Sequence, residues 1–392
     1  MSLAASNLRV LVMAGGTGGH VFPALAVAEC LRDRGAEVRW LGALGGMEST
    51  LVPQHGFEFH GIAIRGLRGN GLRGWLSAPW RVLRATCTAM AVLRKMRANV
   101  VLGMGGFASG PGGLAAWLTR RPLVIHEQNA VAGLTNRILS RLANRVLEAF
   151  PGSFAASFAA HPSGNPVRTA IAALPAPAQR FAARDHDDID RNEAGNDSDR
   201  AAGQTKDDRP VLRLLVLGGS QGARVFNEVV PQALAMLADR VRVEVCHQTG
   251  KSHLQSTSRA YQELALEVTR VGGPVAFIDD MAQRYGWADL VLCRAGAMTI
   301  AELASAGVAS ILVPFPHAVD DHQTANARYL SDAQAAVLLP QSQLVPSRLA
   351  TILEEFAHRR ERLLAMAEAA RGRAMIDASE RVAQHCMEVA HV

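Results

Sequence analysis

The sequence predicts an α/β fold with two doubly wound domains, each built around a parallel sheet. The first observation is length, because 392 residues exceed what one ordinary core holds. The second is the alternation of short apolar runs with helical patterns, which is typical of a parallel sheet with helices on both faces. The third is a repeated design, in which a buried strand runs directly into a glycine-rich turn, once in each half of the chain.

In the first half, the opening strand is expected over Val10–Met13, before the turn Gly15–His20 and a helix over Val21–Leu31. An apolar, β-branched run that ends in small residues is typical of a buried parallel strand feeding a helix. Such a turn presents backbone N–H groups at a helix N-terminus, where they attract phosphate or an electron-rich hydroxyl. His20 stands beside this turn, and histidine is the side chain that most readily exchanges a proton near neutral pH.

The remaining elements follow the same alternation. Further strands of the first half are expected over Val38–Leu41, Val100–Leu102 and Leu123–His126. The design restarts with a strand from Val211, the turn Gly218–Gly222 and a helix over Val225–Leu237. Further strands of the second half are expected over Val241–Cys246, Val275–Ile278, Leu290–Cys293 and Ser310–Val313, before a helical stretch over Pro346–Val392.

Composition sets the domain boundaries. We expect a first domain over residues 1–170, a linker over 171–210, a second domain over 211–375, and a helix over 376–392 that packs back on the first domain. Residues 184–209 contain nine acidic and five basic residues and few large apolar ones. Such a segment cannot bury enough surface to offset its ordering entropy, so it is predicted to be a disordered acidic insert.

A nicotinamide-binding protein is disfavoured. Its fingerprint, G-x-G-x-x-G, needs a third glycine where Val21 stands when counted from Gly16. The second strand, Glu37–Gly42, also ends without a carboxylate for a ribose.

The five scattered cysteines include no C-x-x-C pair, which fits a reducing cytoplasm and gives no support for a zinc site. The sequence has neither a secretory signal pattern nor an unbroken apolar span, so a soluble or peripheral protein is expected.

A basic region in the first domain points to an anionic partner. The chain has a net charge of +6, and no acidic residue lies between Glu58 and Glu127. Cations interleaved with large apolar side chains suit an anionic membrane surface. The alternative is a solvated helix whose tryptophans, together with Leu76 and Leu83, belong to the core. Nucleic acid is disfavoured because no binding motif accompanies the charge. The membrane-facing candidates are Arg73, Trp75, Leu76, Trp80, Arg81, Leu83 and Arg84.

Seven segments lie where predicted strands end or predicted helices begin. They are Gly15–His20, Gly103–Gly112, His126–Asn129, Gly164–Arg168, Gly218–Arg224, Cys293–Glu302 and Asp320–Asn326. In type and order they closely resemble the MurG family, the peripheral N-acetylglucosaminyltransferases of bacterial peptidoglycan synthesis within the GT-B glycosyltransferases. The likeness covers nearly the whole chain except the insert. It implies the GT-B architecture of two Rossmann-like domains that face a cleft.

The resemblance implies that N-acetylglucosamine passes from UDP-N-acetylglucosamine to the C4 hydroxyl of undecaprenyl-diphospho-muramoylpentapeptide, with inversion. It places the protein at the cytoplasmic face of the inner membrane, with cell-wall and division proteins as further partners and no cofactor. An attacking hydroxyl needs a base, and His20 is the catalytic candidate. The alternatives are that His20 only caps the helix or binds acceptor phosphate.

The resemblance also implies the contacts with UDP-N-acetylglucosamine. Ile278 would contact uracil through its backbone, and Glu302 would accept hydrogen bonds from the ribose hydroxyls. Gln323 would contact the hydroxyls of the sugar. Ser220 and its glycine turn would stabilise the diphosphate. The other implied contacts are Thr17, Gly18, Gly19, Asn129, Arg168, Ala297, Met298, Thr299, Ile300 and Ala301. A helix-face carboxylate and an ion pair between domains are the structural alternatives for Glu302 and Arg168.

No D-x-D pair ends a predicted strand, so metal-independent transfer is expected. Two other functions remain open. A UDP-N-acetylglucosamine 2-epimerase would share the two-domain arrangement but would need catalytic carboxylates, and His126–Asn129 with Gly218–Arg224 favour the transferase. A non-catalytic membrane scaffold is opposed by the presence of His20, Glu302 and Gln323.

Overall fold

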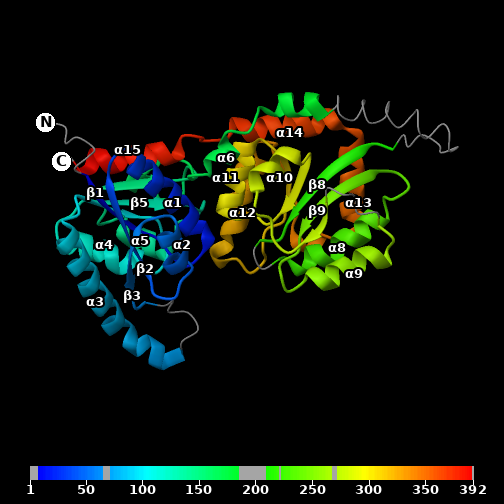
Figure 1. Cartoon of the computed structure of the whole chain (residues 1–392). Helices are drawn as coiled ribbons and strands as arrows, with labels where there is room; N and C mark the ends of the chain where they lie inside the picture. The colour runs from blue at the N-terminus through cyan, green and yellow to red at the C-terminus, as the bar shows by residue number, and fades with distance from the viewer. Residues whose placement is uncertain (1–7, 65–70, 185–208, 220–221, 267–271, 391–392) are drawn as a thin grey trace. The chain divides into compact units, whose positions relative to one another are not determined.

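The computed structural model describes residues 8–64, 71–184, 209–219, 222–266 and 272–390, without the side chains of residues 71–78 and 319. It divides into two compact units (Figure 1). Unit 1 comprises Met1–Arg168 with Met375–Val392, and unit 2 comprises Thr169–Ala374. The predicted disordered insert, apart from its two end residues, lies outside the described residues.

The described part of unit 1 contains a seven-stranded sheet in the order β3-β2-β1-β4-β5-β6-β7, and every neighbouring pair is parallel. Its strands are β1 (Arg9–Met13), β2 (Glu37–Ala43), β3 (Glu58–Ile62), β4 (Val100–Gly103), β5 (Leu123–Glu127), β6 (Arg145–Glu148) and β7 (His161–Pro162). Its helices are α1 (Gly18–Asp33), α2 (Glu48–Gln54), α3 (Gly71–Met96), α4 (Ser109–Leu118), α5 (Leu134–Leu139) and α15 (Ala378–Ala390), with a short 3-10 turn at Ala156–Phe158. The strand order reverses between β1 and β4, and ligands of such sheets bind beside the carboxyl ends of the strands at this reversal.

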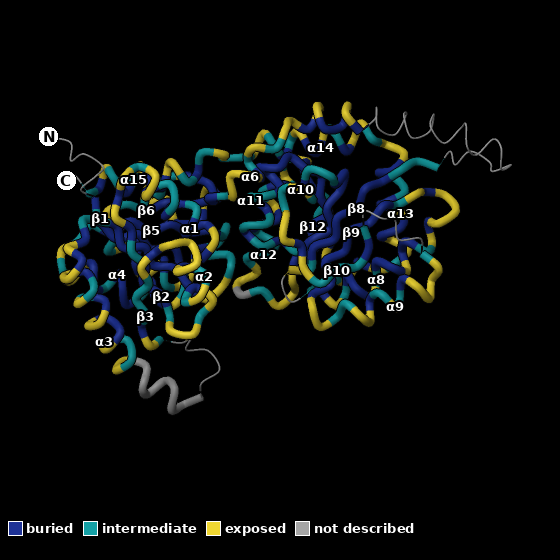
Figure 2. Tube along the Cα trace, viewed as in Figure 1, coloured by how far each residue is buried: buried dark blue, intermediate teal, exposed yellow. Residues whose placement is uncertain are grey.

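Alternation along β1 divides the core of unit 1 into two layers. Val10 and Val12 join the cluster that α1 covers, whereas Leu11 and Met13 join the cluster under α3 and α4. A parallel strand covered on both faces therefore contains apolar residues at consecutive positions. Figure 2 shows the central strands of this unit as mostly buried and the outer turns of its helices as exposed.

The last helix, α15, belongs to the same unit as the first strand. It packs on α1, β4 and β5, and its Val382, Ala383, Cys386 and Val389 are buried in the cluster around Val10. The chain thus returns to complete one layer of the first core.

The described part of unit 2 contains a six-stranded parallel sheet in the order β10-β9-β8-β11-β12-β13. Its strands are β8 (Val211–Leu217), β9 (Arg242–Gln248), β10 (Gly273–Val275), β11 (Leu290–Cys293), β12 (Ala309–Leu312) and β13 (Ala336–Leu338). Its helices are α6 (Thr169–Ala172), α8 (Arg224–Ala235), α9 (Leu254–Glu263), α10 (Met281–Trp287), α11 (Ala297–Ala306), α12 (His322–Ser331), α13 (Pro346–His358) and α14 (Arg360–Gly372), with 3-10 turns at Val319–Asp321 and Gln341–Gln343. A further helical segment covers residues 177–184. The order reverses between β8 and β11, as it does between β1 and β4 in unit 1.

The sequence prediction of two doubly wound α/β units is confirmed, and most central strands lie where they were expected. The strand expected over Val275–Ile278 is wrong, because β10 ends at Val275 and Ile278 lies in the following loop. Strands β3, β6, β7 and β13 were not predicted, and three of them (β3, β7 and β13) are outer strands of the two sheets. Outer strands pair on one side only and have little periodicity, so their sequences are weakly constrained.

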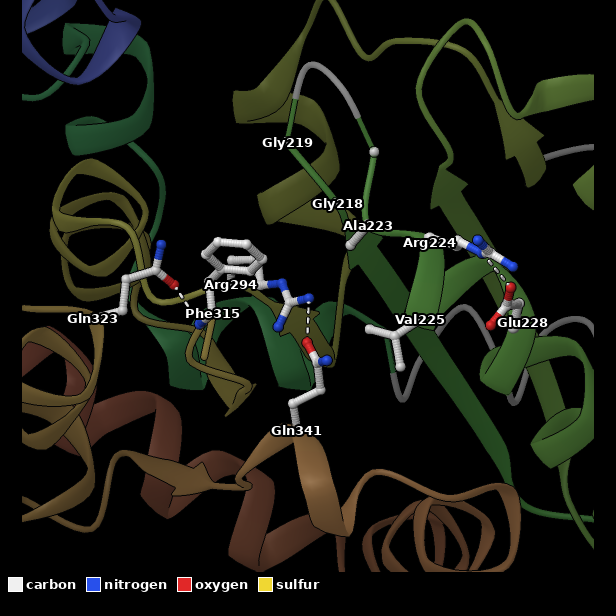
Figure 3. Close-up of a pocket in the computed structure, with 11 residues that line it drawn as sticks. Gly218, Gly219, Ala223, Arg224, Val225, Glu228, Arg294, Phe315, Gln323 and Gln341 are labelled. Carbon is white, nitrogen blue, oxygen red and sulfur yellow. Dashed lines mark hydrogen bonds and ion pairs between the residues drawn. The ribbon is translucent and has the colours of Figure 1, made fainter. Parts of the chain in front are cut away.

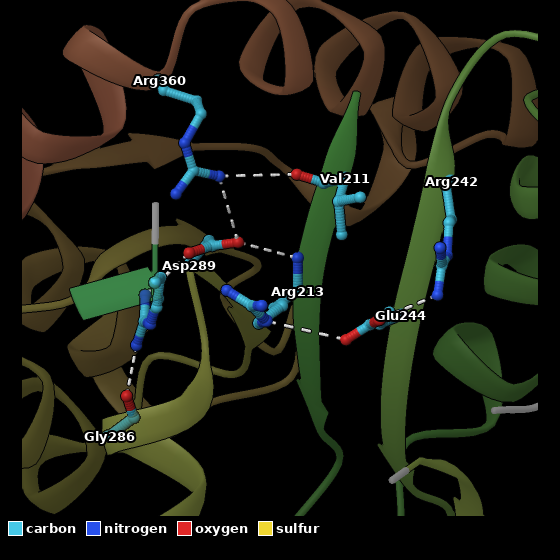
Figure 4. A network of polar contacts seen from close by, with 8 residues as sticks. Val211, Arg213, Arg242, Glu244, Gly286, Asp289 and Arg360 are labelled. Carbon is cyan, nitrogen blue, oxygen red and sulfur yellow. Dashed lines mark hydrogen bonds and ion pairs between the residues drawn. The ribbon is translucent and has the colours of Figure 1, made fainter. Parts of the chain in front are cut away.

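A buried ion network ties the start of unit 2 to its sheet (Figure 4). Asp289 is fully buried, and its Oδ1 lies 2.7 Å from Nη1 of Arg184. Its Oδ2 accepts the backbone N–H of Arg213 at 2.9 Å and lies 3.7 Å from Nη1 of Arg360. Burial lowers the pKa of Arg184, and the nearby Asp289 carboxylate partly offsets this effect. One carboxylate therefore compensates two arginine charges and accepts one backbone N–H, from three separate segments.

We expect Asp289→Ala to lower the free energy of unfolding by about 3–5 kcal/mol, because it leaves buried arginine charges without their counter-ion. Urea denaturation followed by circular dichroism measures the effect. The matched control is Arg240→Ala, which removes an exposed ion pair with Glu354 at 2.6 Å and should cost no more than about 1 kcal/mol. Equal losses from both variants would contradict a special role for the buried carboxylate.

Candidate active site

The glycine turn after β1 places the start of α1 at the strand reversal of unit 1. Thr17 is extended and precedes α1, and His20 is the third residue of the helix. The loop after β4 is joined to the end of β1 because Met104 N–H donates to Met13 O at 2.8 Å. The two loops on either side of the strand reversal are therefore held together by the backbone.

A buried carboxylate fixes the glycine turn. Glu48 at the start of α2 is fully buried, and its Oε2 accepts the N–H of Gly16 at 3.2 Å while Oε1 accepts that of Ala43 at 3.0 Å. A Cβ on Gly15 would lie 2.2 Å from Glu48 Oε1, so this position has no room for a side chain. The shape of the turn thus depends on a residue more than thirty positions away.

The His20 ring packs against the loop after β4, where Gly105 has no side chain to occupy the same space. Its Nδ1 lies 2.9 Å from Oε1 of Gln128. A Cβ on Gly105 would lie 2.6 Å from the same Nδ1, and Gly105 has a φ of +86°, which glycine adopts far more easily than other residues. The hydrogen bond to Gln128 and the contact with Gly105 therefore hold the His20 ring in place at the start of α1.

Polar residues at the end of β5 form a buried hydrogen-bonded group behind His20. His126 Nε2 donates to the carbonyl of Gly164 at 2.8 Å, and Gln128 Nε2 lies 3.1 Å from both His126 Nδ1 and Met104 O. His126 is fully buried, and this burial lowers its pKa to about 4, so the ring is neutral at pH 7.

Glu127 shapes the next loop. Its Oε1 accepts both the backbone N–H and the side-chain amide of Asn129, at 3.0 and 3.1 Å. Its Oε2 accepts from Gly133 N–H at 3.1 Å and from Asn136 Nδ2 at 2.9 Å. A buried carboxylate with four donors satisfies its hydrogen-bonding capacity within the protein, so Glu127 organises the site and fixes the Asn129 side chain.

The backbone of the glycine turn in unit 2 is also tightly constrained. Gly219 and Gly222 have φ values of +79° and +76°. A Cβ on Gly222 would lie 1.9 Å from Thr249 O, and one on Gly218 would lie 2.3 Å from Ala223 N. The turn leads directly into α8, whose N-terminal N–H groups and dipole favour an anion such as phosphate.

A pocket of about 640 Å³ opens at this turn (Figure 3). It is lined by the glycine turn, the start of α8, the segments after β11, β12 and β13, and the start of α12. The lining residues are Gly218, Gly219, Gly222, Ala223, Arg224, Val225, Glu228, Arg294, Phe315, Gln323 and Gln341. Gln323 is oriented by the loop after β12, because its Oε1 accepts the N–H of Phe315 at 2.9 Å. Its amide nitrogen is thereby left as the group that can donate to a ligand oxygen.

Arg294 supplies a positive charge to this pocket. Its Nη2 donates to Gln341 Oε1 at 2.7 Å, and its Nη1 donates to Val313 O at 3.2 Å. The guanidinium carbon lies 5.0 Å from the centre of the Phe226 ring and 5.4 Å from that of Phe315. Burial lowers the pKa of Arg294, yet an arginine stays charged at pH 7. A held cation beside a phosphate-type turn suits a diphosphate.

The helix α11 starts at the end of β11, with Gly296 before its first residue. Ile300 is fully buried and its N–H donates to Gly296 O at 3.0 Å, so its amide is already used within the helix. Glu302 is half-buried, and its Oε2 accepts the hydroxyl of Tyr285 at 3.1 Å. The first-turn amides and an anchored carboxylate thus lie on one helix.

Comparison with known proteins identifies the family. The N-terminal domain model of glycosyltransferase family 28 matches residues 10–148, and the C-terminal domain model matches residues 213–382. A protein of Marinobacter nauticus is 50% identical over 98% of both chains, and one of Chromohalobacter salexigens is 53% identical over 97% of this chain and 96% of its own. Both are named UDP-N-acetylglucosamine--N-acetylmuramyl-(pentapeptide) pyrophosphoryl-undecaprenol N-acetylglucosamine transferase. This chain belongs to that family.

Solved structures agree with membership of this MurG family. The crystal structure of MurG from Acinetobacter baumannii is 39% identical, covers 97% of this chain and 99% of its own, and superposes with a TM-score of 0.78. A putative UDP-N-acetylglucosamine 2-epimerase from Listeria monocytogenes has a TM-score of 0.61 at 11% identity, which shows a shared fold alone. The resemblance read from the seven segments and the GT-B fold is confirmed.

The structure places the expected binding residues in two groups. In unit 1, Thr17, Gly18, Gly19 and His20 gather at the start of α1, Asn129 lies on the loop after β5, and Arg168 is exposed at the end of the unit. In unit 2, residues 297–302 open α11, while Gln323 lines the pocket and Ile278 has a buried side chain. Ser220 lies outside the described residues.

Sequence reasoning missed the residues that hold the site in shape. Glu48 is an unremarkable helix residue in sequence, and nothing local indicates its contact with Gly16. Gln128 and Arg294 lie inside segments that carry the family resemblance, but no function was predicted for either residue. Polar side chains at the carboxyl end of a buried strand were the signal that could have found them.

Two apolar residues of the basic region, Trp80 and Leu83 on α3, do not belong to the core, so that alternative is wrong for them. Trp80 and Leu83 have exposed fractions of 70% and 54%, while Ala85, Ala89 and Leu93 form the buried side of the helix. Arg84 is exposed and Arg81 half-buried. The side chains of Arg73, Trp75 and Leu76 lie outside the described residues. Within the described part of the chain, no helix combines the length and apolar character needed to cross a membrane.

We expect Gly105→Ala to lower the turnover number about 100-fold, because its Cβ would displace the His20 ring, and misplacements near 1 Å carry costs of this order. Steady-state kinetics of sugar transfer measures the effect. Gly152→Ala is the matched control, since Gly152 has a similar φ of +88° but no atom within 4 Å of the added Cβ. Unchanged turnover in Gly105→Ala would contradict a functional placement of His20.

Proposed function

We propose that this protein transfers N-acetylglucosamine from UDP-N-acetylglucosamine to the C4 hydroxyl of undecaprenyl-diphospho-muramoylpentapeptide, with inversion at the anomeric carbon. The names of relatives about 50% identical over nearly the full chain support this substrate pair. The observation that carries the proposal is the glycine turn of unit 2 at a helix start, with Arg294 held in the same pocket.

In the proposed reaction, the acceptor oxygen forms a bond with the anomeric carbon while the bond from that carbon to the diphosphate oxygen breaks. The acceptor hydroxyl loses its proton to His20, which lies in the first turn of α1 in unit 1. A positioned base typically contributes 10²–10⁴ in rate to such a step. UDP leaves with the bonding electron pair and an additional negative charge.

The protein groups of unit 2 are suited to stabilise the departing UDP. The glycine turn presents backbone N–H groups at the start of α8, and Arg294 adds a fixed positive charge. We infer that these groups make the transfer independent of a metal ion. Glu302 would accept from the ribose hydroxyls and Gln323 would donate to the sugar, in keeping with their anchored oxygens.

The direct test is transfer of labelled sugar from UDP-N-acetylglucosamine to a lipid-linked muramoyl acceptor, in the presence of EDTA. We expect full activity for the unmodified protein and a loss of about 10²–10⁴ in turnover for His20→Ala. His55→Ala is the control, because its half-exposed ring pairs with Glu29 at 2.9 Å away from this site. The same assay without EDTA separates the outcomes. No product in either assay would overturn the function, and product that forms only without EDTA would overturn the metal-free step. Full activity of His20→Ala would overturn the role of His20 as the base.

We further propose that the exposed side of α3 docks this enzyme peripherally on an anionic membrane, where its lipid-linked acceptor resides. Trp80 and Leu83 point large apolar groups outward, and Arg84 adds a cation beside them. Shallow insertion of such side chains together with attraction to anionic headgroups is the usual basis of peripheral binding.

Replacing Trp80 and Leu83 by serine is expected to lower partitioning onto vesicles with anionic lipid about tenfold, from the apolar surface that no longer inserts. Sedimentation with vesicles measures this partitioning. Met236→Ser is the control, because Met236 is equally exposed at 52% but lies in unit 2. Binding that is unchanged in the double variant would contradict docking through α3.

A further inference from the structure

The hydrogen bonds behind His20 form a continuous chain with a fixed direction. The chain runs from the Gly164 carbonyl through His126 and Gln128 to His20, with links of 2.8, 3.1 and 2.9 Å. Gln128 and His126 have exposed fractions of only 1% and 0%, so the bond between them is shielded from water. Each link therefore constrains which atom carries a hydrogen.

The direction is set at the Gly164 end. A carbonyl oxygen only accepts, so His126 Nε2 must carry a hydrogen. Burial keeps the His126 ring neutral at pH 7, which leaves Nδ1 without a hydrogen as an acceptor. The Gln128 amide then donates its two hydrogens to His126 Nδ1 and to Met104 O.

The orientation of the Gln128 amide follows from the same acceptors. A flipped amide would place its oxygen against the Met104 carbonyl oxygen and the bare His126 nitrogen, with no hydrogen for either contact. Gln128 Oε1 must therefore face His20. The backbone of Gln128 is also held, because its carbonyl accepts Asn165 Nδ2 at 2.9 Å.

We propose that Gln128 is a positioning residue that fixes the tautomer of His20, so that neutral His20 carries its hydrogen on Nδ1 and presents a bare Nε2 as the base. The amide oxygen accepts only, so the His20 nitrogen that faces it at 2.9 Å donates. This proposal rests on the proposed function, because it specifies which atom of His20 takes the proton from the acceptor hydroxyl. His126 acts one bond further away by orienting the amide.

The functional test compares Gln128→Leu with Gln128→Glu. Leucine has a similar size but no acceptor, and we expect the turnover number to fall about 10- to 100-fold with little change in KM. A buried glutamic acid in its neutral form keeps a carbonyl oxygen for His20 and a hydroxyl for one of the two acceptors, so it should retain most of the activity. Equal losses in the two variants, or a loss confined to KM, would overturn the proposal.

A double variant separates positioning from general damage to the fold. In a His20→Ala background, Gln128→Leu should lower the residual turnover no further, because the group that it positions is already gone. A structural defect would instead reduce the turnover of both backgrounds by the same factor. Thermal unfolding of each variant shows whether the leucine is accommodated.

The tautomer itself can be observed without the reaction. In protein with ¹⁵N-labelled histidine, long-range ¹H–¹⁵N correlation spectra should show neutral His20, assigned by its absence in His20→Ala, with the hydrogen on Nδ1. Gln128→Leu should lose this preference. A hydrogen on Nε2 in the unmodified protein would overturn the proposal even if transfer is observed, whereas a missing transferase activity with the Nδ1 tautomer would refute only the function.

Discussion

The reversal of strand order beside the first strand of each sheet is the constraint on which both sites depend. In unit 1, β1 pairs with β2 on one side and β4 on the other, with Met13 in register with Leu41 and Gly103. In unit 2, β8 pairs with β9 and β11 in the same way. Connections from these central strands leave in opposite directions, so their carboxyl ends stay uncovered. The glycine turns occupy that uncovered edge in both units.

The two turns share a backbone design but differ in what surrounds them. Behind the turn of unit 1 lie neutral, buried hydrogen-bonding groups, namely His126 and Gln128, which hold a histidine. Beside the turn of unit 2 lies Arg294, a held cation next to a helix start. The first environment suits a proton transfer, and the second suits a leaving group that becomes more negative. The proposed division of roles follows from these surroundings, since the turns themselves are alike.

Buried carboxylates provide much of the order around these sites. Glu48 and Glu127 accept backbone N–H groups and thereby fix loops, whereas Asp289 compensates arginine charges. A buried polar group without partners is costly, so each carboxylate strongly favours the one loop geometry that satisfies it. The glycines meet these groups at distances where a Cβ would collide, as at Gly15 against Glu48. The hydrogen bonds of the carboxylate and the missing side chain of the glycine therefore favour the same loop geometry.

The sequence by itself determined the doubly wound fold of both units and the position of most central strands, because buried parallel strands leave a continuous apolar run before a turn. It also determined the family and His20 as the residue of interest, since glycine turns and strand-end segments are local in sequence. Outer strands such as β13 escaped notice because one-sided pairing constrains them weakly. Only the tertiary structure decided that Gln128 faces His20 across 108 positions and that Glu48 holds Gly16. Hydrogen bonds between distant segments have no periodicity or spacing, and they exist only once the sheet has brought the strand ends together.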